Sequence, residues 1–125
     1  MMDEILFRGK RLSDGKWISG ILINYESGLT MIIPKTFSST SYAADDILVN
    51  YRTVGLFTGE DDAHGNKIYH GDILDDGSGT CGFKVLWEGF GFVAQFHLGN
   101  LPLRKDILKG MIVVGNIFDN PNYLV

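Results

Sequence analysis

The sequence has 125 residues, of which 45% are hydrophobic, and its formal net charge at pH 7 is −4. A chain of this length suits one domain, or two lobes sharing one core, and can fold without metal or disulfides. The negative charge argues against generic attraction to nucleic-acid phosphates, and the single cysteine, Cys81, excludes an intramolecular disulfide.

Glycine is abundant and proline scarce, at 16 and 3 residues. This balance predicts turns and bulges between short strands rather than a helix bundle. No apolar run approaches the roughly 20 residues that span a bilayer. Residues 1–4 also lack the basic start and apolar core of a signal peptide. We therefore expect a soluble, cytoplasmic protein with no membrane partner.

The first part of the chain predicts three strands, at residues 4–10, 17–23 and 29–33, separated by glycine-containing turns. Gly20 lies inside the second strand, where a glycine marks a bulge or the close approach of another backbone. A polar loop follows the third strand, and residues 44–48 then predict a helical turn.

The central stretch, residues 53–74, reads as β segments joined by a polar loop. Thr58-Gly59 is expected to end the first segment, and the acidic run at residues 60–62 is too polar to face a core. The turn that follows contains Gly65, which we expect to take a positive φ angle.

Gly71 and Asp72 interrupt the β segment that follows this loop. A short aspartate side chain beside a glycine can accept hydrogen bonds from neighbouring backbone N–H groups. We predict that Asp72 is a latch that fixes how the loop returns to the sheet, and that it does no chemistry.

The last part of the chain predicts a hairpin over residues 81–97, with its turn at Glu88-Gly89 and its aromatic side chains facing the core. Residues 98–102 are expected to leave the sheet, and residues 104–109 to form a helical turn or an irregular connector. Residues 111–118 are apolar on both strand faces, which predicts a central strand. The whole pattern indicates an all-β fold, either a small bent sheet or an SH3-like barrel, with one or two short helical turns.

Three stretches carry a family resemblance: ILFRG at residues 5–9, TVGLFTGEDDAHGNKIYHGDIL at 53–74 and VGNIFDNP at 114–121. Together they resemble the YopX family of small phage and prophage proteins. The sequence departs from the family where HGNK, at residues 64–67, replaces its usual Asn-Gly-Lys order. The resemblance implies a phage or prophage origin and a single β-rich domain over residues 1–125, and it implies no activity.

The acidic loop offers one candidate site, with Asp62, His64, His70 and Asp72. Counted from the start of the acidic run, however, the twelfth position of a calcium loop is Gly71, which has no ligating side chain. The histidines also lack the spacing of zinc ligands. A solvated turn explains these residues better than a metal site does, so we predict no metal, no other cofactor and no catalytic residue.

The N-terminal hairpin offers a second candidate site, with Arg8, Arg11 and Trp17. A nucleic-acid platform combines basic groups with exposed aromatic side chains. Core aromatics beside solvated basic side chains would give the same pattern.

The absence of a complete catalytic constellation favours a non-enzymatic module that recognises a host or phage protein in the cytoplasm of the host bacterium. Two alternatives stay open. One is a metal-dependent enzyme that uses the acidic loop around Asp62 and Asp72, and the other is a nucleic-acid-binding small β-barrel that uses the N-terminal basic hairpin. We expect poor binding of nucleic acid and weak self-association through exposed strand edges.

Overall fold

The computed structural model describes residues 5–36, 44–79 and 82–123. The chain divides into two compact units, unit 1 (residues 1–56) and unit 2 (residues 57–125), and each has its own buried hydrophobic cluster. The single domain over residues 1–125 stays a prediction. Cys81 lies outside the described residues.

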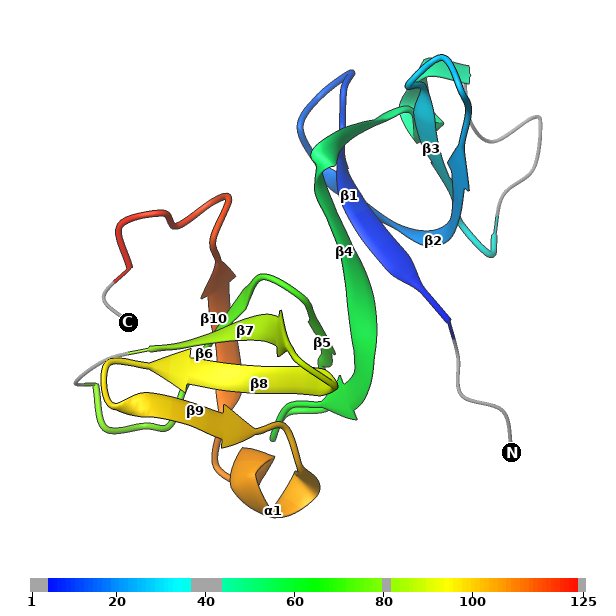
Figure 1. The fold of residues 1–125 in the computed structure, drawn as a ribbon. Helices are drawn as coiled ribbons and strands as arrows, with labels where there is room; N and C mark the ends of the chain where they lie inside the picture. The colour runs from blue at the N-terminus through cyan, green and yellow to red at the C-terminus, as the bar shows by residue number, and fades with distance from the viewer. Residues whose placement is uncertain (1–4, 37–43, 80–81, 124–125) are drawn as a thin grey trace. The chain divides into compact units, whose positions relative to one another are not determined.

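Unit 1 contains a bent antiparallel sheet in the order β3-β2-β1-β4 (Figure 1). Its strands are β1 (Phe7–Arg11), β2 (Trp17–Asn24), β3 (Thr30–Ile33) and the first part of β4 (Val49–Asp61). One isolated bridge, between Met31 and Leu48, brings β3 back to the residue before β4. The bent sheet that we predicted is therefore present, and the described residues do not close it into a barrel.

The predicted helical turn before β4 is a 3₁₀ helix, η1 (Ala44–Ile47). It supplies one of the four buried side chains around which unit 1 packs. These are Ile18, Ile32, Ile47 and Val49.

Gly20 lies where β2 changes its neighbour. Up to Gly20 the strand pairs with β1, and from Ile21 onward it pairs with β3. A Cβ atom at Gly20 would lie 2.1 Å from the carbonyl oxygen of Ile33. The close backbone approach predicted at this glycine is confirmed, and it lets one strand serve two partners.

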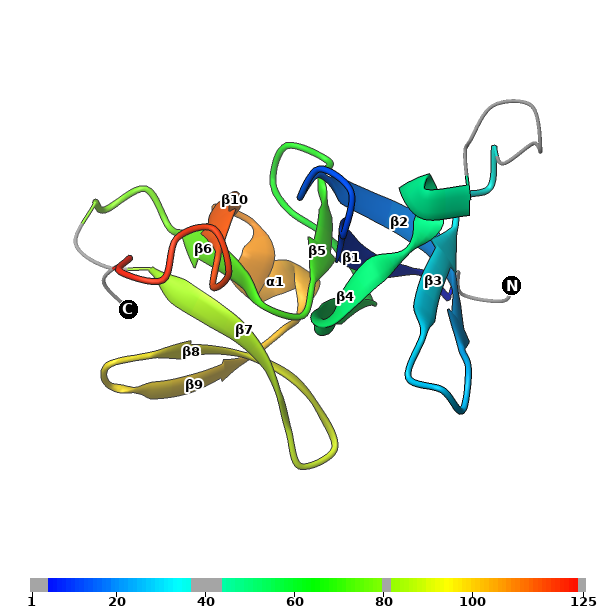
Figure 2. The same cartoon turned by 90° about the horizontal axis from the view of Figure 1, so that it is seen from above.

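Unit 2 contains a second antiparallel sheet, in the order β10-β6-β7-β8-β9. Its strands are β6 (Asp72–Asp75), β7 (Phe83–Glu88), β8 (Gly91–Phe96), β9 (Gly99–Pro102) and β10 (Ile112–Asn116). A short strand, β5 (Lys67–Tyr69), pairs with the last part of β4. The predicted C-terminal helical turn is α1 (Lys105–Leu108), which follows β9 (Figure 2).

The core of unit 2 gathers side chains from β5, β6, β7, β8 and α1, together with the residue before β10. They are Ile68, Leu74, Phe83, Val85, Ala94, Leu108 and Met111. The all-β prediction is confirmed. None of the helices in the described part of the chain is long and apolar enough to cross a membrane.

Three local predictions for this half of the chain are wrong. Thr58-Gly59 does not end β4, because Gly59, with φ +89°, is accommodated in an irregular stretch of the pairing with β5. Residues 99–102 do not leave the sheet, because they pair with β8 as β9. The strand at residues 112–116 is not central, because β10 lies at one edge of its five-stranded sheet.

We expect Gly20→Ala to lower the free energy of unfolding by about 3 kcal/mol or more, because the added methyl group overlaps the backbone of Ile33. Gly110→Ala is the matched control, since a Cβ there meets nothing within 4 Å. It should leave stability unchanged or raise it by up to about 1 kcal/mol. Chemical denaturation of both variants measures the difference, and equal stabilities would refute this account of β2.

Candidate functional site

The loop between β4 and β5 is built around the carboxylate of Asp62. One carboxylate oxygen, Oδ1, accepts hydrogen bonds from the backbone N–H groups of His64 and Asn66, at 2.9 and 2.8 Å. The other, Oδ2, accepts one from the backbone N–H of Val113 at 2.9 Å and one from the Asn66 amide at 3.3 Å. Asp62 is only 6% exposed. The prediction that the acidic run avoids the core is therefore wrong for Asp62, although Asp61 beside it is exposed.

A β-turn from Asp62 to Gly65 brings these donors to the carboxylate. The backbone N–H of Gly65 donates to the carbonyl oxygen of Asp62 at 3.0 Å, and Gly65 has the predicted positive φ, +82°. Aspartate at the first position and glycine at the fourth are typical of a type I turn. The sequence therefore contained the signal for this turn, and our prediction did not connect it with Asp62.

The same loop covers one edge of the second sheet. On one side β10 pairs with β6. On the other, the backbone N–H of Ala63 donates to the carbonyl oxygen of Met111 at 2.8 Å, and the N–H of Val113 reaches Asp62. Asp62 and Val113 are 51 residues apart in the sequence. The carboxylate thus occupies a place that a neighbouring strand would otherwise fill.

The pKa of Asp62 reflects this arrangement. Burial raises the pKa, but the backbone N–H groups of Val113, Asn66 and His64 stabilise the charged form and together hold the pKa below its ordinary value. Asp62 is therefore an ionised hydrogen-bond acceptor at neutral pH. A carboxylic acid that donates a proton in catalysis needs the opposite shift.

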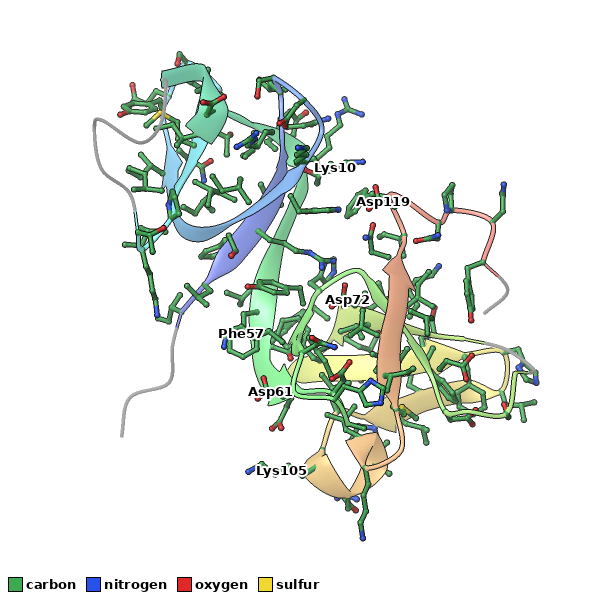
Figure 3. The ribbon with its side chains drawn as sticks, turned by 180° about the vertical axis from the view of Figure 1, so that it is seen from behind. Lys10, Phe57, Asp61, Asp72, Lys105 and Asp119 are labelled. Carbon is green, nitrogen blue, oxygen red and sulfur yellow. The ribbon has the colours of Figure 1, made fainter. Side chains whose placement is uncertain are left out.

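Asp72 is the second buried carboxylate of the candidate site, at the other end of β5. It is 1% exposed, and its Oδ2 accepts a hydrogen bond from the backbone N–H of Tyr69 at 2.7 Å. Gly71 before it has φ +92° and donates its N–H to the carbonyl oxygen of Val85 at 2.8 Å. Figure 3 shows Asp72 among the strands of unit 2, whereas Asp61 lies at the end of β4. The hydrogen bond expected of a latch is present.

The closing motif of the sequence lies beside Asp72. Asn116 is the strand partner of Asp72, and its Oδ1 accepts the backbone N–H of Phe118 at 3.0 Å. The side chain of Asn120 accepts the N–H of Asn116 at 3.1 Å, and it lies so close that a Cβ at Gly115 would be 2.3 Å from its Oδ1. Two stretches that carry the family resemblance therefore meet at one place in unit 2. Sequence analysis missed the part played by Asn116, although asparagine commonly bonds to the backbone two residues ahead.

The candidate histidines do not join these acids in a metal centre. His64 is exposed on the turn and contributes its backbone N–H, while the ring of His70 lies 6.4 Å from that of Phe92. Within residues 5–36, 44–79 and 82–123, no group of three or more His, Cys, Asp or Glu side chains is placed to hold a metal ion.

In the N-terminal hairpin, the basic side chains already contact Trp17 or a carboxylate. The guanidinium carbon of Arg8 lies 4.6 Å from the ring centroid of Trp17, and Lys10 Nζ lies 5.8 Å from it. Arg11 instead bonds to Asp14 through Nε at 3.0 Å and lowers the pKa of that carboxyl to about 2. A stacking base would compete with the protein's own cations for the indole of Trp17.

An open hollow of about 320 Å³ lies between the end of β4 and α1. Glu60 and Asp61 line it from β4, and Lys105 and Lys109 line it from the helical segment. The labelled side chains Asp61 and Lys105 lie on the same side of unit 2 (Figure 3). Opposite charges on the two walls give this hollow no single preference for an anion or a cation.

The turn between β7 and β8 exposes large aromatic side chains. The central residues of the turn are Gly89, with φ +61°, and Phe90, so the turn lies one residue later than predicted. Phe90 is fully exposed and Trp87 is 55% exposed. Trp87 packs edge-on against Phe92 with ring centroids 5.0 Å apart.

We call Trp87, Phe90 and Phe92 the aromatic finger. The turn extends away from the rest of unit 2 (Figure 2). The prediction that this aromatic face lies in the core holds for Phe83, but it is wrong for Trp87 and Phe90. The reason is that the paired strands continue beyond the buried cluster.

Compared with known protein families, the chain matches the model described as YopX protein over residues 6–125. The match includes the stretches at residues 53–74 and 114–121 that meet beside Asp72. A search of curated proteins found no match.

Asp62→Ala should lower the free energy of unfolding by about 3 kcal/mol or more, because several backbone N–H groups lose a charged acceptor.

Asp72→Ala removes the hydrogen bond from the backbone N–H of Tyr69 and should lower the free energy of unfolding by about 1.5–3 kcal/mol, with Asp72→Asn lowering it less. Asp61→Ala and His64→Ala, both exposed, are the controls and should stay within about 0.5 kcal/mol of wild type. Thermal and chemical denaturation measure these effects. Wild-type stability in Asp72→Ala would rule out the latch.

The lowered pKa of Asp62 predicts a pH-dependent contribution to stability. This contribution is complete above the unfolded-state value of 3.8 and is lost as the pH falls through the lower folded-state value. The free-energy gap between wild type and Asp62→Asn should therefore be constant from neutral pH to about pH 5 and shrink below about pH 4. Urea titrations across this range measure the gap. A gap that widens in acid would contradict the assignment.

Proposed function

Starting from the fact that this chain belongs to the YopX protein family, we propose that it is a phage or prophage protein that works as a non-enzymatic protein-interaction module. Its place of action is the cytoplasm of the host bacterium. Its partner is a host or phage protein, recognised through side chains on the surface.

The observation that carries this proposal is the structural role of the two buried carboxylates. Asp62 and Asp72 both accept hydrogen bonds from backbone N–H groups. Asn116, the strand partner of Asp72, also accepts backbone N–H groups. The polar residues that would be the first candidates for catalysis thus have a structural role that accounts for their presence.

The aromatic finger supports recognition of a protein. Tryptophan is among the residues that carry most of the binding energy in protein interfaces, and aromatic residues in general are enriched there. Fully exposed Phe90 lies on the hairpin turn beside Gly89, and half-exposed Trp87 lies near the end of β7 just before this turn. A partner that covers them removes a large apolar area from water.

The enzyme and nucleic-acid hypotheses have less support. A metal-dependent enzyme would need carboxylate oxygens of Asp62 and Asp72, but both oxygens of Asp62 and Oδ2 of Asp72 already accept backbone hydrogen bonds. A nucleic-acid binder would need a free basic surface, whereas the net charge is −4 and Arg11 is bonded to Asp14.

Affinity capture from host cells that carry the phage or prophage tests the proposal. Wild type should retain a specific protein, and the double variant Trp87→Ala with Phe90→Ala should lose it. Leu98→Ala, at another exposed apolar position, is the matched control and should retain it. Asp72→Asn should also retain the partner, provided that it folds. Loss with Asp72→Asn, but not with the finger variant, would replace the module by an acidic-site enzyme.

A further inference from the structure

Unit 1 carries a hollow of about 410 Å³ that we call the tyrosine hollow. It is lined by Asn24, Tyr25, Gly28, Thr30 and Tyr51. Its volume lies within the range of roughly 300–1,000 Å³ that is usual for small-molecule pockets, and it has room for a phenyl ring.

Local geometry keeps this hollow open. The backbone N–H of Gly28 donates to the carbonyl oxygen of Tyr25 at 2.9 Å, which forms the turn between β2 and β3. Gly28 has no side chain, and a Cβ there would meet nothing within 4 Å. Tyr25 and Tyr51 are both at least half exposed, so their rings offer an aromatic surface that water now covers.

The aromatic finger of unit 2 carries a protruding aromatic side chain. Phe90 is fully exposed at the end of a two-residue turn, and Glu88 is the charged residue nearest to it in the sequence. A protruding phenyl group of this kind fits a concave aromatic site better than a flat surface, because its faces and its edge are all desolvated.

Charge complementarity favours one orientation of this pair. The guanidinium carbon of Arg52 lies 5.7 Å from the ring centroid of Tyr51, so a cation lies beside the tyrosine hollow. Arg52 and Glu88 are exposed, and neither forms an ion pair with another described residue. Glu26, on the turn next to Tyr25, is also exposed and would repel Glu88. The favoured approach brings Glu88 to Arg52 and away from Glu26.

We propose that the aromatic finger of one copy of this chain docks into the tyrosine hollow of a second copy, with Phe90 inserted and Glu88 beside Arg52. The inference uses the finger named in the proposed function, but it concerns assembly of the purified protein alone. If the purified protein does not self-associate, the result expected from the capture experiment stays the same.

The contact is heterologous, since finger and hollow are different surfaces. A heterologous contact leaves a free finger at one end and a free hollow at the other, so copies add in series unless a ring closes. Pairing of sheet edges has less support in unit 2, because β9 has only four residues and ends in Pro102, and the loop at Asp62 covers part of β10. One inserted side chain buries far less than the roughly 1,200 Å² of a stable interface, so the association is weak.

Sedimentation of the purified chain over a wide concentration range is the first test. The weight-average mass of wild type should rise continuously with concentration, and Phe90→Ala should weaken association at least about tenfold. Leu98→Ala is the matched control, because it removes an exposed apolar side chain from a different turn. A monomeric wild type, or equal association by Phe90→Ala, would overturn the proposal.

Mixing two variants tests the heterologous contact directly. Phe90→Ala keeps its hollow, and Tyr51→Ala keeps its finger, so each alone should be largely monomeric. Their mixture should form a complex of two chains and grow no further. A mixture that stays monomeric would overturn the docking of finger in hollow.

If Tyr51→Ala disturbs folding, reversing the charges of Arg52 and Glu88 tests the same contact between finger and hollow. Arg52→Glu and Glu88→Arg should each weaken association, and the double variant should restore it toward the wild-type level. Glu26→Gln should strengthen it. Double-variant association weaker than that of both single variants would show that these charges do not meet, and would overturn the proposed orientation.

Discussion

The hydrogen bonds accepted by Asp62 hold together parts of unit 2 that regular strand pairing leaves apart. The carboxylate binds the turn that follows it and the backbone of β10, which is 51 residues later in the sequence. A buried charge is costly unless hydrogen bonds replace its water. Several backbone N–H groups supply that replacement here, and the same bonds satisfy donors that the fold would otherwise bury without partners.

Asp72 and the closing motif extend this arrangement along β6 and β10. Gly71 and Gly115 allow backbone segments to come close, while Asp72 accepts a backbone hydrogen bond through Oδ2 and pairs with Asn116 across the strands. Such residues resemble a catalytic cluster in a sequence, because glycines, acids and amides recur in both. In this fold their common property is that they accept backbone hydrogen bonds or leave space for a neighbouring chain segment.

The two surfaces proposed for recognition are built from residues that do not belong to this framework. Gly89 turns the β7–β8 hairpin so that Phe90 faces solvent, and Gly28 leaves the tyrosine hollow without a side chain on that wall.

The sequence by itself determined what depends on near neighbours: the positive φ of Gly65, the helical turns, the close backbone approach at Gly20 and the β7–β8 hairpin within one residue. It also indicated the all-β class and the family, because both follow from local residue patterns. Only the tertiary structure decided that Asp62 is buried, that β10 lies at an edge of its sheet and that Trp87 and Phe90 face solvent. Alternation along a strand shows which side chains share a face, but it does not show how far the core extends beneath that face. The burial of Asp62 likewise depends on Val113, a partner that no pattern within the loop can specify.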